Sequence, residues 1–129
     1  TLAIIRHESG GNAYAVNTQV RSHYPRTVAE AERIAVEAIR AGRRPDMGLM
    51  QVNSQWLRRY NVTPAQLFDP CTNIRIGTTI LSQNYAATWA KYRAEKPALL
   101  GALSLYNTGD EARGLRNGYV AKVIRKAGV

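Results

Sequence analysis

The chain is organised around one run, Ile5-Arg6-His7-Glu8-Ser9-Gly10-Gly11-Asn12, in which a carboxylate lies at the end of an apolar helix. Leu2 and Ile5 are three residues apart, so both can face a core from one side of that helix. The glycine pair predicts that the helix stops directly after Glu8. A carboxyl group there meets the negative end of the helix dipole, which disfavours its ionisation. Shielding from water would raise its pKa further, and a general acid needs a proton held in this way. On this run alone, a surface glutamate at a fraying helix end is the simpler interpretation.

Length and composition indicate one globular domain that spans residues 1–129. The apolar share is 45%, and we find no internal repeat, linker or low-complexity tract. No apolar run reaches the roughly 20 residues that a membrane-spanning helix needs. The sequence opens in mid-helix at Thr1 without a methionine. We therefore expect a mature or trimmed domain, with its signal peptide removed, that is monomeric.

The chain is strongly basic, with 18 Lys and Arg against 9 Asp and Glu and a net charge of +9. Such a charge attracts polyanions in a salt-dependent way, and nucleic acid, an anionic wall polymer and a membrane surface are all candidates. The arginines are scattered, however, and no helix-turn-helix, zinc-finger or aromatic RNA-binding signature is present. We therefore expect no nucleic-acid partner.

Cysteine and histidine usage predicts that the chain holds no metal or other cofactor. The single cysteine, Cys71, excludes an internal disulfide and a cysteine-based metal cluster. We expect it to be buried as a small apolar residue, with a disulfide partner upstream of Thr1 as the alternative. His7 neighbours Glu8, but consecutive helical side chains diverge by about 100°. His23 has no carboxylate or cysteine pattern around it.

Hydrophobic periodicity and capping residues predict a mainly α-helical chain with at most a small β element. The expected elements are a short hairpin or irregular loop in 12–25, a helix from the capping box at Thr27 to Gly42, a short strand or extended turn in 49–53, a long helix from Asp69-Pro70 to about Arg93, a helix over 98–106 opened by Pro97, a mobile loop in 109–118 and a last helix from Tyr119.

Three segments combine polar side chains with backbone breaks beside these helices. They are residues 8–12, 48–53 and 104–109, which contribute the amides of Gln51, Asn53 and Asn107 and the apolar surfaces of Met50 and Tyr106. Amides bond sugar hydroxyls and N-acetyl groups, while apolar surface covers the C–H face of a sugar ring. A groove for a sugar chain is one interpretation. The other is that the amides cap turns and Tyr106 fills the core.

Together the segments resemble the motif set of the soluble lytic transglycosylase family, within the lysozyme superfamily. The ordered set is E-S-G-G-N, G-L-M-Q-V-N, F-D-P-C-x-N-I, A-L-S-L-Y-N-T-G and N-G-Y-V, and it covers nearly the whole chain. The third and last motifs most resemble the small transglycosylases of type IV secretion and conjugation systems. The resemblance implies a lysozyme-like α+β fold with a small β element near the active-site cleft. It also implies peptidoglycan glycan strands as substrate, secretion or conjugation components as partners, and a periplasmic location.

The resemblance also implies roles for particular residues. Glu8 corresponds to the catalytic acid and base, which protonates the oxygen between N-acetylmuramic acid and N-acetylglucosamine. Its carboxylate then takes the C6 hydroxyl proton, so that a 1,6-anhydro ring closes. The residues that would line the groove are Ser9, Met50, Gln51, Asn53, Tyr106, Asn107 and Tyr119.

Asp46 is a candidate second carboxylate. The stretch from Asp46 to Ser54 also resembles the part of animal-type lysozymes whose aspartate is a nucleophile or stabiliser, and most glycosidases use two carboxylates. Capping a turn after Pro45, or pairing with Arg43 or Arg44, would explain Asp46 equally well. The alternatives to a transglycosylase are a lysozyme-type hydrolase that uses Glu8 and Asp46, and a catalytically silent wall-binding assembly module.

Overall fold

A computed structural model describes residues 1–128 of the chain. The chain forms two compact units, of which the first comprises Thr1–Gly77 and the second begins at Thr78. The boundary falls inside the long helix α5 (Pro70–Tyr92), which was predicted to start at Asp69-Pro70. Asp69 does cap this helix, because its carboxylate accepts hydrogen bonds from the Thr72 N–H at 2.9 Å and the Thr72 hydroxyl at 3.0 Å.

The first unit contains a small antiparallel sheet with strand order β2-β1-β3-β4. Val16 lies opposite His23 on one side and Met47 on the other, and Met47 in turn lies opposite Val52. Of the two alternatives expected within residues 12–25, a short hairpin or an irregular loop, the structure shows the hairpin, as β1 and β2. The elements of this unit before α5 are α1 (Leu2–Glu8), β1 (Val16–Asn17), β2 (Ser22–His23), α2 (Val28–Arg40), β3 (Asp46–Met47), β4 (Val52–Asn53), α3 (Trp56–Arg59) and α4 (Pro64–Leu67).

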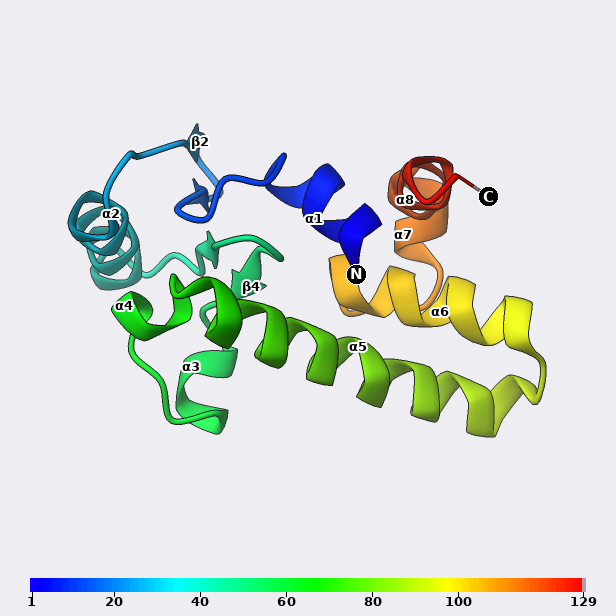
Figure 1. Ribbon diagram of the computed structural model, residues 1–129. Helices are drawn as coiled ribbons and strands as arrows, with labels where there is room; N and C mark the ends of the chain where they lie inside the picture. Colours follow the sequence, from blue (N-terminus) through cyan, green and yellow to red (C-terminus); the bar gives the residue numbers. More distant parts are fainter. Residues whose placement is uncertain (129) are drawn as a thin grey trace. The chain divides into compact units, whose positions relative to one another are not determined.

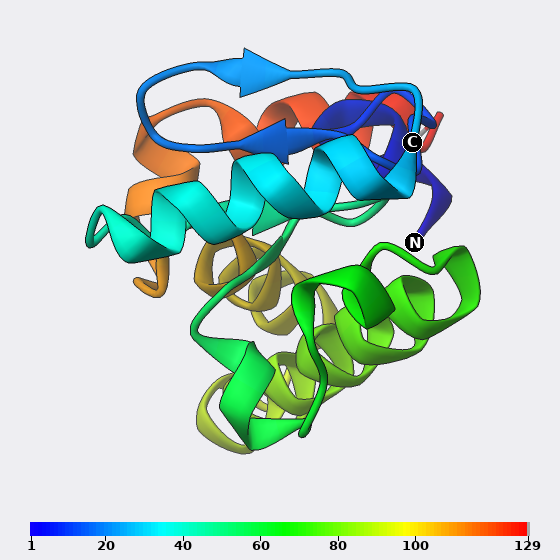
Figure 2. The ribbon, with the colours of Figure 1, turned by 90° about the vertical axis from the view of Figure 1, so that its left-hand side faces the viewer.

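Helix α2 begins where its capping box predicted, since the Thr27 hydroxyl accepts a hydrogen bond from the Glu30 N–H at 3.2 Å. Its buried face is alanine-rich, and it packs against β1 and α4, with the β1–β2 hairpin beside it in Figure 2. The core of the unit is completed by large apolar side chains that include Ile4, Val16, Met47, Met50, Val52, Leu67 and Phe68.

The second unit contains the rest of α5 together with α6 (Glu95–Thr108), α7 (Arg113–Arg116) and α8 (Tyr119–Lys126). Figure 1 shows α6 running back along the C-terminal half of α5. The two helices meet closely because the Thr88 hydroxyl donates to the Ala98 carbonyl oxygen at 2.7 Å. A Cβ on Gly101 would lie 3.0 Å from the Thr88 methyl group, so glycine permits this approach.

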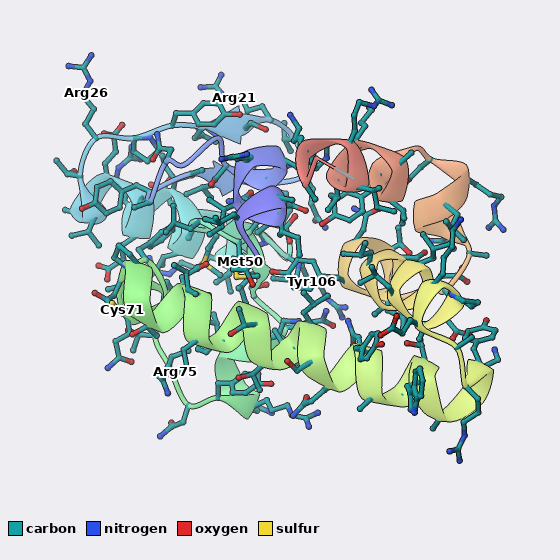
Figure 3. All side chains as sticks on the ribbon, turned by 45° about the vertical axis from the view of Figure 1, so that its right-hand side comes forward. Arg21, Arg26, Met50, Cys71, Arg75 and Tyr106 are labelled. Carbon is teal, nitrogen blue, oxygen red and sulfur yellow. The ribbon has the colours of Figure 1, made fainter. Side chains whose placement is uncertain are left out.

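The structure corrects three expectations. Helix α6 begins at Glu95, before Pro97, because a proline in the first helical turn withholds an N–H that would have no helical partner anyway. The segment 109–118 holds α7 rather than a loop alone, and the Gly114 N–H donates to the Ser104 hydroxyl at 2.8 Å. Cys71 is exposed at the start of α5 (Figure 3), whereas Asn73 and Ile76 on the same helix are buried.

Candidate functional site

The turn after Glu8 is built by the residues that follow it. Glu8 is the last residue of α1 and is half-buried. The buried Ser9 hydroxyl donates to the Ile5 carbonyl oxygen at 3.1 Å and accepts from the Gly11 N–H at 3.2 Å. Gly10 and Gly11 have φ values of 61° and 88°, in the left-handed region. The helix therefore ends where the sequence predicted, and the Ser9 side chain holds the backbone next to the carboxylate.

The β3–β4 connection is a tight turn built around Gln51. The Gln51 N–H donates to the Gly48 carbonyl oxygen at 3.0 Å. Gln51 has a φ of 50°, which is uncommon for a residue with a side chain. Its side-chain amide donates to the carbonyl oxygens of Gly48 and Ala15, both at 2.9 Å. These bonds hold a conformation that costs about 1–3 kcal/mol of backbone strain, as is often found at functional sites.

Hydrogen bonds join this turn to the segment that carries Glu8. The Ala15 carbonyl oxygen also accepts from the Gly48 N–H at 2.9 Å, and the Ala15 N–H donates to the Asn12 carbonyl oxygen at 3.3 Å. The Asn12 N–H donates in turn to the Ser9 carbonyl oxygen at 3.1 Å. The first unit thus brings together two of the three predicted polar segments.

Asn73 on α5 holds the β3–β4 turn from inside the core. Its side chain is completely buried. Its oxygen accepts from the Met50 N–H at 2.8 Å, and its nitrogen donates to the carbonyl oxygens of Met47 and Leu67, both at 2.9 Å. A Cβ on Gly48 would collide with the Asn73 amide, so glycine is required there. One side chain thereby satisfies three buried backbone groups from separate segments.

Met50 supports the same turn from beneath. Its side chain is completely buried, and Figure 3 shows it pointing toward α5. A Cβ on Gly77 would lie 2.5 Å from the Met50 sulfur, so the mid-helix glycine makes room for this side chain. Met50 is therefore part of the core beneath the turn in this structure.

Asp46 and Asn53 lie opposite each other on β3 and β4. The Asn53 side chain donates to Asp46 Oδ1 at 2.9 Å and to the Arg44 carbonyl oxygen at 3.0 Å, and its own oxygen accepts from the Gln55 N–H at 3.0 Å. Burial raises the pKa of the Asp46 carboxyl, and the bond from Asn53 opposes that rise. The ion pairs seen within residues 1–128 include none between Asp46 and Arg43 or Arg44.

The second unit carries the other three predicted residues. Tyr106 is half-buried on α6, Asn107 next to it is exposed, and Tyr119 at the start of α8 is buried. Asn117 links two of them, because its amide nitrogen donates to Asn107 Oδ1 at 2.9 Å and its oxygen accepts from the Tyr119 N–H at 2.9 Å. This bridge ties the end of α6 to the start of α8.

Two organising residues, Asn73 and Asn117, were not among the predicted site residues. Each lies in a motif that the sequence displayed, F-D-P-C-x-N-I for Asn73 and N-G-Y-V for Asn117. An asparagine among the apolar residues of a long helix was the available signal for the first, because a buried amide needs hydrogen-bond partners. An asparagine directly before glycine was the signal for the second.

No three His, Cys, Asp or Glu side chains among residues 1–128 gather closely enough to hold a metal ion. None of the helices described is both long and apolar enough to cross a bilayer.

A mainly helical chain with a small antiparallel sheet confirms the predicted fold class. The family described as Transglycosylase SLT domain matches residues 1–126. The chain therefore belongs to the transglycosylase SLT domain family. The match confirms the resemblance to the soluble lytic transglycosylase family that the motif set predicted.

Several curated proteins are similar to the chain. Protein virB1 of Agrobacterium fabrum is 34% identical over 123 residues, which cover 94% of this chain and 50% of that protein. The type IV secretion system protein virB1 of Brucella abortus is 35% identical over 137 residues, with coverages of 98% and 57%. Protein virB1 of Rhizobium radiobacter is 31% identical over 123 residues. The chain spans about half the length of these relatives. No solved structure matches it at a significant level.

Proposed function

We propose that residues 1–129 form the catalytic domain of a peptidoglycan lytic transglycosylase. It cleaves the β-1,4 bond between N-acetylmuramic acid and N-acetylglucosamine and leaves a 1,6-anhydro-muramyl end. The observation that carries the proposal is the family match over residues 1–126, in a chain whose first motif places Glu8 at the end of α1. The proposed glycan contacts, or supports of the backbone that makes them, are Ser9, Met50, Gln51 and Asn53 in the first unit and Tyr106, Asn107 and Tyr119 in the second.

Glu8 acts first as an acid and then as a base. Its proton moves to the bridging oxygen as the bond from that oxygen to C1 of the muramic acid unit breaks. The resulting carboxylate takes the proton of the C6 hydroxyl on the same unit, and the C6 oxygen bonds to C1. Glu8 ends the cycle protonated and no water is consumed, so one residue performs both transfers.

The hydrogen-bonded backbone directly after Glu8 supports these roles. The turn formed by Ser9, Gly10 and Gly11 fixes the backbone directly after the carboxylate, and Ala15 connects it to the turn at Gln51. Groups held in this way lose little entropy when the substrate binds, which is a large part of catalytic efficiency. The shape of the turn thus prepares the carboxylate for proton transfer.

The test is the product released from purified peptidoglycan sacculi. Wild-type protein should release muropeptides with anhydro ends, each lighter by one water than a hydrolysed product, as read by mass spectrometry. Glu8→Gln, which keeps the shape of the side chain and removes its proton transfer, should lower the rate by at least about 100-fold. Full activity in this variant, or release of muropeptides with reducing ends in place of anhydro ends by the wild-type protein, would overturn the proposal.

A lysozyme-type hydrolase that uses Asp46 is the second candidate, because that carboxyl is shielded from water on the strand after Arg44. Asp46 lies opposite Asn53 and accepts a hydrogen bond from its side chain, which gives this carboxyl a structural role in the strand pair. We therefore assign catalysis to Glu8 alone. Asp46→Asn should keep the anhydro product and most of the rate, whereas a hydrolase would lose both its rate and its reducing-end products.

We propose further that the protein works as a monomer in the bacterial periplasm, where it opens the wall locally for a type IV secretion or conjugation apparatus. Support comes from the similarity to virB1 proteins, one of which is named as part of a type IV secretion system. A strain whose chromosomal copy carries Glu8→Gln should lose substrate transfer while its wall remains intact. Undiminished transfer in that strain would favour a silent assembly module instead.

A further inference from the structure

The second unit carries an aromatic surface that the proposed reaction does not use. Trp89 is 39% exposed and Tyr92 is 40% exposed, which is unusual for side chains of this size on an ordered helix. The Tyr85 ring lies one turn before Trp89 and stacks with it, with centroids 6.3 Å apart and planes inclined by 27°. These rings line the C-terminal half of α5.

A hollow of about 330 Å³ lies on this surface. It is lined by Tyr85, Ala86 and Trp89 from α5 and by Glu95 from the first turn of α6. The hollow is shallow and open, so a ligand would lie with one face on its lining and the other in solvent. Its lining combines two aromatic rings with a single carboxylate.

The two helices that line the hollow are joined to each other, and its carboxylate lies outside the ion pairs of the described residues. The bond from Thr88 to Ala98 fixes α5 against α6. Lys91, a cation on α5, pairs with Glu111 at 2.7 Å and lies over the Tyr92 ring. Among the residues described, Glu95 joins neither of the ion pairs. Its carboxylate can therefore accept hydrogen bonds from a ligand.

Charge decides between two ligands that suit aromatic rings beside a carboxylate. A cationic side chain would have to approach a strongly basic segment, since residues 78–129 contain eight Lys and Arg against three Asp and Glu. The basic residues are Lys91, Arg93, Lys96, Arg113, Arg116, Lys122, Arg125 and Lys126, and the acidic ones are Glu95, Asp110 and Glu111. A neutral ligand meets no such repulsion.

We propose that this hollow is a second saccharide-binding site, which takes an N-acetylhexosamine unit of a glycan strand. The sugar's C–H face lies on the rings of Tyr85 and Trp89, and Glu95 accepts a hydrogen bond from a hydroxyl or from the acetamido N–H. The choice of sugar rests on the proposed function. Such a site would keep the enzyme on the strand between cleavage events.

The test follows Trp89 directly. The protein is labelled with 5-fluorotryptophan, and its two fluorine NMR signals are assigned with Trp56→Phe. Glu8→Gln serves as the background, so that the probe, N-acetylglucosamine tetrasaccharide, is not cut. We expect the Trp89 signal to shift saturably, and Tyr85→Ala to weaken the apparent affinity about threefold to tenfold, the range that one ring contact contributes.

Tyr92→Ala is the matched control, because it removes an equally exposed ring from the same helix but outside the lining of the hollow. It should leave the Trp89 titration unchanged, and Glu95→Ala should weaken it severalfold. A Trp89 signal that does not move at saturating tetrasaccharide, or that responds instead to a lysine methyl amide probe, would overturn the proposal. Circular dichroism of each variant shows that it is folded.

Failure of this site and failure of the proposed function give different results. Trp89→Ala should cut soluble muropeptide oligomers at the wild-type rate but should sediment less with intact sacculi. If Glu8→Gln abolishes product release but the Trp89 fluorine signal does not shift with tetrasaccharide, only the proposal of the second site is wrong. If Trp89 titrates but wild-type protein releases no muropeptides, only the catalytic proposal is wrong.

Discussion

At the scale of single residues, the Asn73 side chain holds the β3–β4 turn through hydrogen bonds to three backbone groups. Its two amide atoms serve a donor from Met50 and acceptors from Met47 and Leu67, all of them buried. An aspartate would lose the donating end, and a serine would not reach all three groups. The turn that carries Gln51 therefore depends on one amide on another element.

We expect Asn73→Ala to lower the free energy of unfolding by at least about 3 kcal/mol, because each orphaned buried group costs about 1–3 kcal/mol. Urea denaturation of the variant measures this loss. Gln83→Ala is the control, since Gln83 is an exposed carboxamide on the same helix. Equal stability of the two variants would contradict the role assigned to Asn73.

The Asp46 carboxyl should make the stability of the folded protein depend on pH. Its pKa is raised in the folded protein above the ordinary value of 3.8, mainly by burial, so the folded state holds this proton more tightly than the unfolded state. Protonation of Asp46 therefore stabilises the fold at pH values below 3.8. This stabilisation is lost as the pH rises through the pKa of the folded state. Asp46→Asn should remove that loss.

The melting temperature of Asp46→Asn, measured in steps from acid to neutral pH, should therefore match or exceed that of wild type at neutral pH. An asparagine still accepts a hydrogen bond from Asn53, so the strand pair remains in place. A variant that loses stability at every pH would show that the carboxylate itself supports β3 and β4.

Sequence reasoning located Glu8 at its helix end and Gln51 on a turn because glycines and periodicity are local signals. It did not identify the partners of these residues. The bonds from Gln51 to Ala15 and from Met50 to Asn73 span 36 and 23 residues, and no local pattern encodes such pairings. Burial of Met50 and exposure of Cys71 likewise depend on which face each element turns inward.

At the scale of elements, the starts of helices with a capping side chain were predicted best, whereas the start of α6 was not. Thr27 caps α2 and Asp69 caps α5, because a side-chain oxygen that accepts a backbone N–H three residues later is a local arrangement. The β strands were predicted only as short extended segments, since two-residue strands are set by their pairing and not by alternation.

The cap of α5 can be tested through pH. The pKa of Asp69 is lowered, first by the hydrogen bond from the Thr72 N–H and then by that from its hydroxyl. Such a carboxylate stabilises the fold above its unfolded pKa, and this contribution is lost as the pH falls through the folded pKa. Asp69→Ala should lower the melting temperature at neutral pH and reduce its fall in acid, whereas Asp69→Asn, which still accepts hydrogen bonds, should lower it less.

Gly77 tests the contact between α5 and the β3–β4 turn. Replacing a helical glycine with alanine usually stabilises by about 1 kcal/mol. Here the new methyl group would meet the Met50 side chain in a filled core, so Gly77→Ala should instead destabilise by about 1–3 kcal/mol. In the double variant with Met50→Ala, the total loss of stability should be smaller than the sum of the losses in the two single variants. A loss equal to that sum would argue against the contact.

At the scale of the whole molecule, the net charge of +9 predicts salt-sensitive binding to an anionic wall. Screening shortens the range of charge interactions from about 10 Å at 0.1 M salt to about 3 Å at 1 M. Sedimentation of Glu8→Gln with sacculi should therefore fall as salt rises. Binding that salt does not change would assign retention to the sugar contacts alone.

The short sheet has a consequence for the order of folding. Each of its strands contains two residues, too few for a hairpin to persist by itself in water. We therefore expect the β3–β4 hairpin to form only after α5 has brought Asn73 into contact with it. The bonds from Asn73 to Met47 and Met50 close a loop of more than 20 residues. Amide exchange followed from the unfolded chain should show protection first in α2 and α5 and last at Met50 and Gln51. The part of the molecule nearest the proposed chemistry would thus be the last to acquire its native form.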